Sequence, residues 1–175
     1  RDRVLLPHPS KETRFFDTHF QRGLKWYRAH YPAPQGERRV GEIGPTYFAS
    51  KEARERIAKT FPDAKIVCIF RNPVERLISL YRVRRAYGLI AWSFEEALHR
   101  DEEMIESSRY AAHLRAWLDT MGDGQVLAAV YDDLRADPQQ FLDRLVDFIR
   151  IPRFKLTDSQ VRYVHGSDAM THPRN

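Results

Sequence analysis

The sequence predicts an α/β fold with a mostly parallel sheet and helices on both of its faces. Two largely apolar runs, 64–70 (AKIVCIF) and 125–131 (QVLAAVY), have the length and composition of strands buried on both faces. A helical pattern follows each run, and alternating strands and helices are typical of βαβ units. Ligands of such sheets bind beyond the carboxyl ends of the strands, so the residues after positions 43, 70 and 131 are the first candidates for a site.

The N-terminal part is expected to hold two helices and one short strand. Apolar residues at helical spacing predict the first helix, and an N-cap with acidic residues in the first turn predicts the second. Proline and glycine mark the breaks between them. The expected elements are a loop over 1–10, a helix from Asp17 to about His30, a loop at 32–36, a strand over 39–43 and a helix from Ser50 through Lys59.

The rest of the chain alternates the two apolar strands with helices. Asn72 and Asp137 each precede a proline, and this pair of residues is typical of an N-cap followed by the first helical position. After position 152 the pattern weakens. The expected elements are helices from Pro73 to about Tyr87, from Ser93 to His99, from Ser107 to Thr120 and from Pro138 to Arg150, then an irregular stretch at 166–175.

The composition indicates a single domain over residues 1–175. Of these residues 42% are hydrophobic, and no apolar run approaches the roughly 18 residues of a membrane span. The single Cys68 excludes an internal disulfide and a Cys-based zinc site. The net charge of +5 favours an anionic partner, and only six of the 29 basic residues are lysines. Arginine suits bidentate recognition of phosphate, sulfate or carboxylate, although a GC-rich genome would produce the same bias.

The junction between the strand 64–70 and the next helix is a candidate anion site. Arg71 stands where the strand ends, and a helix N-terminus attracts negative charge. Ser79 lies two turns after Asn72 and returns to the same face, so Arg71 and Ser79 could hold one phosphate. Glu75 could complete a capping box with Asn72. The competing interpretation is a capped helix whose Arg71 pairs with a surface carboxylate.

A second group of charged residues crowds a predicted boundary between loop and helix. Lys11, Glu12, Arg14, Asp17 and His19 all lie there. A carboxylate beside two cations tends to stay ionised and can accept a proton from a hydroxyl. The competing interpretation is a solvated, salt-bridged helix start.

The segment GEIGPTYF (41–48) contributes one further carboxylate, Glu42. Glu42 follows the short strand and could face a cleft or serve a structural role, and the structural role is favoured. The sequence has no convincing metal-ligand spacing and no nucleophile elbow.

Taken in order, these stretches resemble the sulfotransferase family that uses 3′-phosphoadenosine 5′-phosphosulfate (PAPS). The nearest resemblance is to bacterial sulfotransferases and to the sulfotransferase domains that modify heparan sulfate. It implies a three-layer fold related to nucleotide kinases. It also implies that Arg71 and Ser79 bind the 3′-phosphate, that Glu12 is the catalytic base, and that Lys11 and Arg14 lie beside the cofactor or acceptor. The strings that carry it are KETRFFD, RGLKWYRAHYP, GEIGPTYF, AKIVCIFRNPVERLISLYR, SFEEAL, SSRYAAHLRAWL and VYDDLRADPQQFLDRLVDFIRIP.

Two departures from the family pattern concern the ends of the sequence. The KxGTT-like loop for the 5′-phosphosulfate and the closing loop near the C-terminus are both absent, so we expect a domain that is incomplete at both ends, with weak cofactor binding and little activity as it stands. Ile43 stands where heparan-type enzymes often have lysine, which argues against a heparan acceptor. The absence of an Asn-x-Ser/Thr sequon favours a bacterial, cytoplasmic protein over one of the Golgi lumen.

The resemblance implies in-line transfer of a sulfuryl group from PAPS to a hydroxyl or amine of a carbohydrate or small molecule. The product would be adenosine 3′,5′-bisphosphate, and no metal is needed. One alternative is a nucleotide-kinase-like phosphotransferase, which a GxxxxGK[ST] loop upstream would favour. The other is a non-catalytic module that binds an acidic glycan or nucleic acid through Arg82, Arg84 and Arg85, although no nucleic-acid motif is present.

Overall fold

The computed structural model describes residues 4–32 and 39–166, and the chain divides into two compact units. Unit 1 comprises residues 1–64 and 113–126, and unit 2 comprises residues 65–112 and 127–175. The α/β class that the sequence predicts is confirmed. The described residues form two separate two-stranded sheets, β1–β2 and β3–β4, where one larger sheet was expected.

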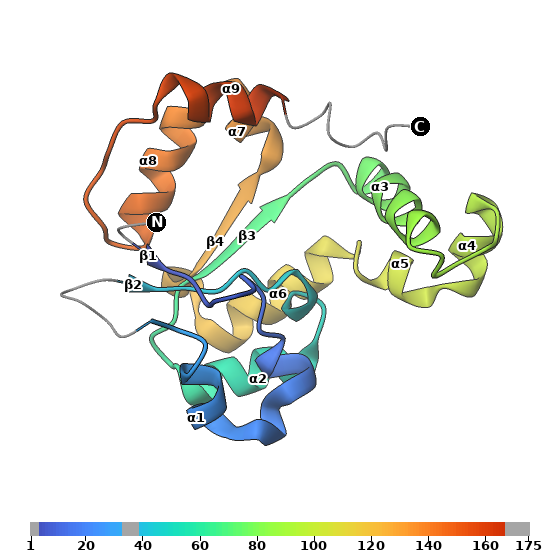
Figure 1. Ribbon diagram of the computed structural model, residues 1–175, viewed down its shortest axis with the longest axis horizontal. Helices are drawn as coiled ribbons and strands as arrows, with labels where there is room; N and C mark the ends of the chain where they lie inside the picture. The colour runs from blue at the N-terminus through green and yellow to red at the C-terminus, as the bar shows by residue number, and fades with distance from the viewer. Residues whose placement is uncertain (1–3, 33–38, 167–175) are drawn as a thin grey trace. The chain divides into compact units, whose positions relative to one another are not determined.

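Unit 1 combines a small parallel sheet with short helices (Figure 1). Val4 lies opposite Arg39, and Leu5 lies opposite Val40. The elements are β1 (Val4–Leu5), the π-helix η1 (Phe15–His19), the 3₁₀-helix η2 (Phe20–Arg22), α1 (Gly23–Arg28), β2 (Arg39–Val40), η3 (Pro45–Tyr47), α2 (Lys51–Thr60), α6 (Tyr110–Met121, within unit 1 from His113) and η4 (Asp123–Gln125).

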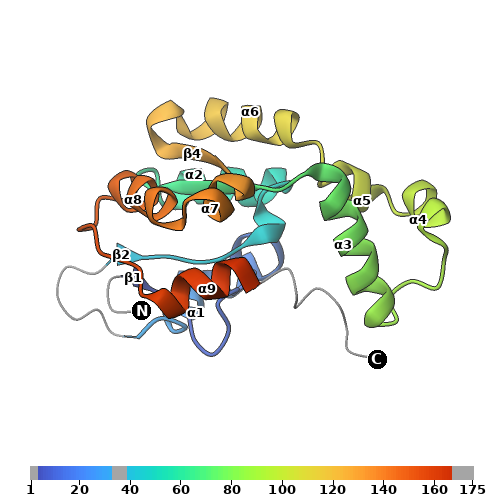
Figure 2. The same cartoon turned by 90° about the horizontal axis from the view of Figure 1, so that it is seen from above.

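Unit 2 contains the neighbouring strands β3 (Ile66–Phe70) and β4 (Val126–Val130), of which only Val126 falls in unit 1. Figure 2 shows α3 grouped with α4 and α5, and α7 beside α8. The helices of this unit are α3 (Pro73–Ala86), α4 (Phe94–Arg100), α5 (Glu102–Glu106), α7 (Tyr131–Ala136), α8 (Pro138–Phe148) and α9 (Asp158–Gly166).

Four helices begin where their capping residues predict. The Ser50 hydroxyl accepts a hydrogen bond from the Ala53 N–H at the start of α2. Ser93 forms a capping box with Glu96 at α4. These side chains satisfy N–H groups that have no partner within the helix. Asn72 caps α3 and Asp137 caps α8 in the same way.

The core of unit 1 explains the aromatic residues near the N-terminus. Phe15 and Phe16 are almost fully buried, and the Phe15 ring stacks on Tyr27 with centroids 4.8 Å apart. Trp117 of α6 is also buried, and its indole N–H donates to the Phe48 carbonyl over 3.0 Å. Phe15, Phe16 and Tyr27 are therefore core residues, whereas Trp26 is half-buried.

The structure corrects two expectations about unit 1. Residues 4 and 5 form a strand inside the segment expected to be a loop. Asp17 is not the cap of the first helix. Arg14 adopts a left-handed backbone conformation (φ 52°), so helical structure begins at Phe15 and Asp17 lies inside the first turn. Gly23, the first residue of α1, has φ 77° and separates η2 from α1, so the expected helix is not continuous.

Three expectations about unit 2 also differ from the structure. Cys68 is buried whereas Ile69 is 48% exposed, so only one face of β3 is covered within the described residues. The Glu75 carboxylate accepts from the Arg71 Nε–H over 3.2 Å, and this pairing replaces the expected capping box. The helix expected from Ser107 begins at Tyr110, because Ser107 and its neighbour donate to the Met104 carbonyl at the end of α5.

In the part of the chain that the structure describes, no helix has the length and apolar character needed to cross a bilayer. The irregular stretch expected at 166–175 lies, apart from its first residue, outside the described residues, as does most of the loop at 32–36.

Candidate functional site

The predicted site residues fall into two groups, one in each unit. Unit 2 holds Arg71 and Ser79, and unit 1 holds the others, which are Lys11, Glu12, Arg14, Asp17, His19 and Glu42. Each group is built by local contacts within its own unit.

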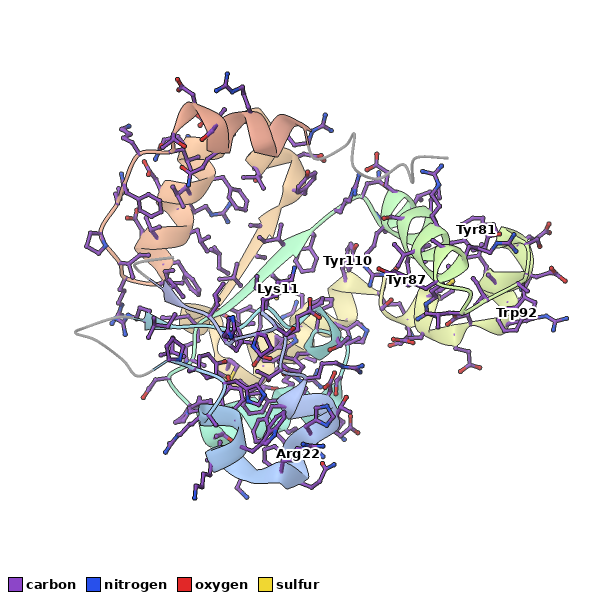
Figure 3. The ribbon with its side chains drawn as sticks, in the orientation of Figure 1. Lys11, Arg22, Tyr81, Tyr87, Trp92 and Tyr110 are labelled. Atoms are coloured by element: carbon purple, nitrogen blue, oxygen red, sulfur yellow. The ribbon has the colours of Figure 1, made fainter. Side chains whose placement is uncertain are left out.

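The Glu12 carboxylate lies on the loop between β1 and η1. Its side chain is 32% exposed, and the Lys11 Nζ lies 4.0 Å from its Oε1. The Glu12 N–H donates to the Ser10 hydroxyl over 3.2 Å, and the Lys11 carbonyl accepts from the Ile43 N–H at the same distance. The Lys11 side chain is mostly exposed and is labelled in Figure 3. The loop therefore presents an accessible carboxylate beside a cation.

Asp17 and Arg14 are brought together at the start of η1. An Arg14 guanidinium nitrogen lies 3.6 Å from Asp17 Oδ2, which also accepts from the Thr46 hydroxyl over 2.6 Å. Asp17 Oδ1 is buried and has no hydrogen-bond partner among the described residues. Arg56 of α2 donates to the carbonyls of Phe16 and Asp17, which fixes the backbone of this turn.

His19 ends η1 in an aromatic environment. Its ring lies 5.4 Å from that of Trp26, in an edge-on arrangement. Trp26 in turn packs against Arg22, which is labelled in Figure 3. The described side-chain contact of His19 is thus with the Trp26 ring and not with the Glu12 or Asp17 carboxylate.

Among the described carboxylates of unit 1, Glu42 accepts the largest number of hydrogen bonds. Its Oε1 accepts from the N–H of Thr13 over 2.6 Å, from the hydroxyl of Thr13 over 2.6 Å and from the hydroxyl of Tyr47 over 2.9 Å. Its Oε2 accepts from the Tyr27 hydroxyl over 3.2 Å, and Tyr27 accepts from Tyr31 over 2.7 Å. Thr13, Tyr27 and Tyr47 are all buried.

Burial raises the pKa of each of the three tyrosines in this network well above its usual value. For Tyr27, the negative charge of Glu42 and the hydrogen bond that Tyr27 donates to it raise the pKa further. The Glu42 charge also raises the pKa of Tyr31 and Tyr47. The three hydroxyls therefore remain protonated, and able to donate, through the neutral and mildly alkaline range.

Sequence reasoning missed the donors that surround Glu42. Thr13, Tyr27 and Tyr47 lie 29, 15 and 5 residues from it, separations with no helical or strand period. One chemical signal could have indicated them. A carboxylate that becomes buried needs hydrogen-bond donors, and the motifs KETRFFD, RGLKWYRAHYP and GEIGPTYF contain residues with hydroxyl groups.

Arg71 occupies the turn between β3 and α3. Its side chain is 35% exposed and pairs with Glu75, which is 60% exposed. Its guanidinium also lies over the Tyr131 ring, 5.5 Å from the centroid. Because Asn72 already caps the N–H groups of Val74 and Glu75, the charge available at this helix start is mainly that of Arg71.

Ser79 is half-buried two turns into α3, on the face that carries Arg76. The Arg76 guanidinium donates to the hydroxyls of Ser107 and Ser108 over 2.9 and 3.0 Å. Arg76 is therefore tied to the segment that follows α5.

Tyr110 joins this group, although the sequence did not single it out. It is the first residue of α6, labelled in Figure 3, and its ring packs on Phe70 with centroids 4.8 Å apart. Burial raises the pKa of Tyr110, whereas the charges of Arg76 and Arg71 lower it. Both guanidinium groups thus act on the Tyr110 hydroxyl.

Within residues 4–32 and 39–166, no cluster of three or more His, Cys, Asp or Glu side chains is arranged to hold a metal ion.

A family model described as "Sulfotransferase family" matches residues 4–155. The chain belongs to the sulfotransferase family. Both groups of predicted site residues lie inside the matched region.

The chain is similar to mammalian heparan sulfate enzymes over most of its length. It is 33% identical over 156 residues to mouse heparan sulfate glucosamine 3-O-sulfotransferase 3B1, covering 84% of this chain and 40% of that protein. It is 28% identical over 168 residues to human bifunctional heparan sulfate N-deacetylase/N-sulfotransferase 2, covering 85% of this chain and 19% of that protein. The chain therefore spans two fifths or less of the length of these two relatives.

Two solved structures share the fold. A sulfotransferase from Alicyclobacillus acidocaldarius matches with a TM-score of 0.76 and 24% identity, over 98% of this chain and 83% of that one. The sulfotransferase domain from the curacin biosynthetic pathway matches with a TM-score of 0.55 and 24% identity, over 69% and 41%. The α/β class predicted from the sequence is thus that of known sulfotransferases.

Proposed function

We propose that this protein is a PAPS-dependent sulfotransferase. It transfers a sulfuryl group in line to a hydroxyl or amine of a glycan or small-molecule acceptor. The observation that carries the proposal is the family match over residues 4–155, which contains both an accessible carboxylate at Glu12 and an arginine at the start of a long helix. We further propose that residues 1–175 act as one domain of a bacterial, cytoplasmic protein, which agrees with the similarity to the Alicyclobacillus structure.

Arg71 and Ser79 are proposed to bind the 3′-phosphate of PAPS. The residues present fit an anion, because Arg71 is partly exposed and its Glu75 partner is a surface carboxylate that a phosphate can displace. A guanidinium binds phosphate through two parallel hydrogen bonds. When bound, PAPS supplies the sulfuryl group and leaves as adenosine 3′,5′-bisphosphate.

Glu12 is proposed to remove the proton from the acceptor. Its carboxylate is accessible, and its backbone is held by Ser10. Lys11 beside it can offset negative charge on the sulfuryl oxygens as transfer proceeds, in the way that cations act in phosphoryl transfer. Arg14, Asp17 and His19 are secondary candidates for contact with the acceptor or cofactor.

The acceptor is proposed to be a carbohydrate or a small molecule carrying a hydroxyl or amine. The similarity to enzymes that modify heparan sulfate supports a carbohydrate. Ile43, in the segment where heparan-type relatives often carry lysine, is 45% exposed and apolar. An apolar side chain at this place favours a less anionic acceptor than heparan sulfate.

The test is transfer of ³⁵S from labelled PAPS by the full-length protein to a panel of oligosaccharides and small hydroxyl or amine compounds. Labelled product with at least one acceptor, together with release of adenosine 3′,5′-bisphosphate, is the expected result. Tight binding of ATP with phosphate transfer, and none with PAPS, would overturn the proposal in favour of a kinase-like activity.

A further inference from the structure

Two consecutive residues, Glu42 and Ile43, form hydrogen bonds with the residues on both sides of Glu12. The Ile43 N–H donates to the Lys11 carbonyl over 3.2 Å, and the Glu42 carboxylate accepts from the Thr13 N–H over 2.6 Å. Lys11 and Thr13 are the two neighbours of Glu12 in the chain. The backbone of Glu12 is thus fixed from both directions by the segment that follows β2.

Glu42 is poorly suited to be a base itself. A carboxylate has about four lone-pair sites, and the described contacts already place four donors on Glu42, three of them on Oε1. The donors are buried or half-buried groups that need this acceptor. A proton taken up by Oε1 would displace a bond from Thr13 or Tyr47 and so loosen the loop that carries Glu12, and Oε2 is engaged by the buried Tyr27 hydroxyl.

We propose that Glu42 is a positioning residue that holds the Glu12 loop in its working geometry through Thr13. This inference rests on the proposed function, because it assigns Glu12 as the base. Tyr27 and Tyr47 hold the carboxylate in turn, and Tyr31 orients the Tyr27 hydroxyl by donating to it. Glu42 therefore acts on catalysis only through the position of Glu12.

The first test compares two substitutions of Thr13. Thr13→Val keeps the shape of the side chain but loses the hydroxyl that donates to Glu42, and Thr13→Ser retains it. A shift of about 1 Å in a catalytic group can cost about 100-fold in rate, so we expect Thr13→Val to lower kcat by roughly 10- to 100-fold. Thr13→Ser should restore most of that loss. Wild-type kcat in Thr13→Val would overturn the proposal.

The second test is a double-mutant cycle between Glu42 and Glu12. Glu42→Gln keeps the size of the side chain but replaces one accepting oxygen by an NH2 donor and leaves the other oxygen without its charge, so it removes or weakens the bonds to Thr13, Tyr27 and Tyr47. We expect it to lower kcat in the wild-type background and to change kcat by less than about twofold in the Glu12→Gln background, because residues acting through one group are not additive. An equal loss in both backgrounds would show that Glu42 acts independently of Glu12, and would refute the inference.

The third measurement does not depend on activity. Hydrogen exchange of the Thr13 amide, followed by mass spectrometry or NMR, should be slow in the wild type and faster in Glu42→Gln. Glu55→Gln, which removes an exposed carboxylate on α2, is the matched control and should leave both exchange and kcat unchanged. Unaltered exchange in Glu42→Gln would overturn the inference. Faster exchange in a protein that transfers no sulfate would contradict the proposed function and leave the Glu42 contact supported.

Discussion

Replacement of Arg71 by alanine should weaken binding of adenosine 3′,5′-bisphosphate by about 10- to 150-fold. A hydrogen bond to a charged group contributes about 1.5–3 kcal/mol, and this range sets the expected change in Kd. One partner of Arg71 is the surface carboxylate of Glu75, and exposed pairs are worth at most about 1 kcal/mol. Breaking this pair therefore costs little when the guanidinium turns from Glu75 to a phosphate.

Isothermal titration calorimetry on the full-length protein measures this effect directly. Adenosine 5′-monophosphate, which lacks the 3′-phosphate, should bind the wild type and Arg71→Ala alike. Glu75→Gln is the matched control, because it removes the paired carboxylate and keeps Arg71, and it should leave affinity unchanged or raise it by up to about fivefold. Equal affinity of wild type and Arg71→Ala for the bisphosphate would refute the assignment of the 3′-phosphate site.

Three further predictions concern single side chains. Ser79→Ala should weaken bisphosphate binding less than Arg71→Ala does, again by calorimetry, and an effect as large would contradict the minor role of the hydroxyl. Ser50→Ala removes the acceptor for the Ala53 N–H and should lower the free energy of unfolding by about 1 kcal/mol in a urea titration, whereas an unchanged midpoint would mean that the cap is dispensable. Burial raises the pKa of Cys68 to about 11, so its thiol stays protonated and should react slowly with iodoacetamide at pH 8 until the protein is unfolded; rapid labelling of the folded protein would contradict this.

Local signals predicted the helix starts well. Ser50, Asn72, Ser93 and Asp137 carry side chains that accept from the first N–H groups of a helix, and this chemistry needs only neighbours three residues away. Asp17 has the same type of side chain but does not cap a helix. The left-handed backbone at Arg14 starts the helix earlier, and the Asp17 carboxylate accepts from the Thr46 hydroxyl instead.

The features that the sequence did not predict depend on distant contacts or on short elements. α7 runs on from β4 at Tyr131, where an expected strand ended, and its start carries no N-cap hydrogen bond. α9 was missed because a stretch after Pro152 with few apolar residues has little periodic pattern. The exposure of Ile69 depends on which elements cover β3, which an apolar run cannot specify.

The same distinction applies to the site. Arg71 and Glu12 stand in motifs whose residue order is recognisable, and the structure places both on partly exposed loops next to helix starts. The role of Glu42 depends on Thr13, Tyr27 and Tyr47, which only folding brings to one carboxylate. Because these residues are far apart in the chain, their spacing in the sequence does not predict the network.

The most direct test of the account is single-turnover sulfuryl transfer by Glu12→Gln in the full-length protein. The amide keeps the size of the side chain but cannot accept a proton, so the transfer rate should fall by roughly 10²–10⁴-fold, the usual contribution of general base catalysis. Affinity for adenosine 3′,5′-bisphosphate should stay within about twofold of wild type, because the base faces the acceptor and not the 3′-phosphate. A near-normal transfer rate in Glu12→Gln, together with an inactive His19→Ala, would contradict the assignment of Glu12 as the base and indicate His19 instead.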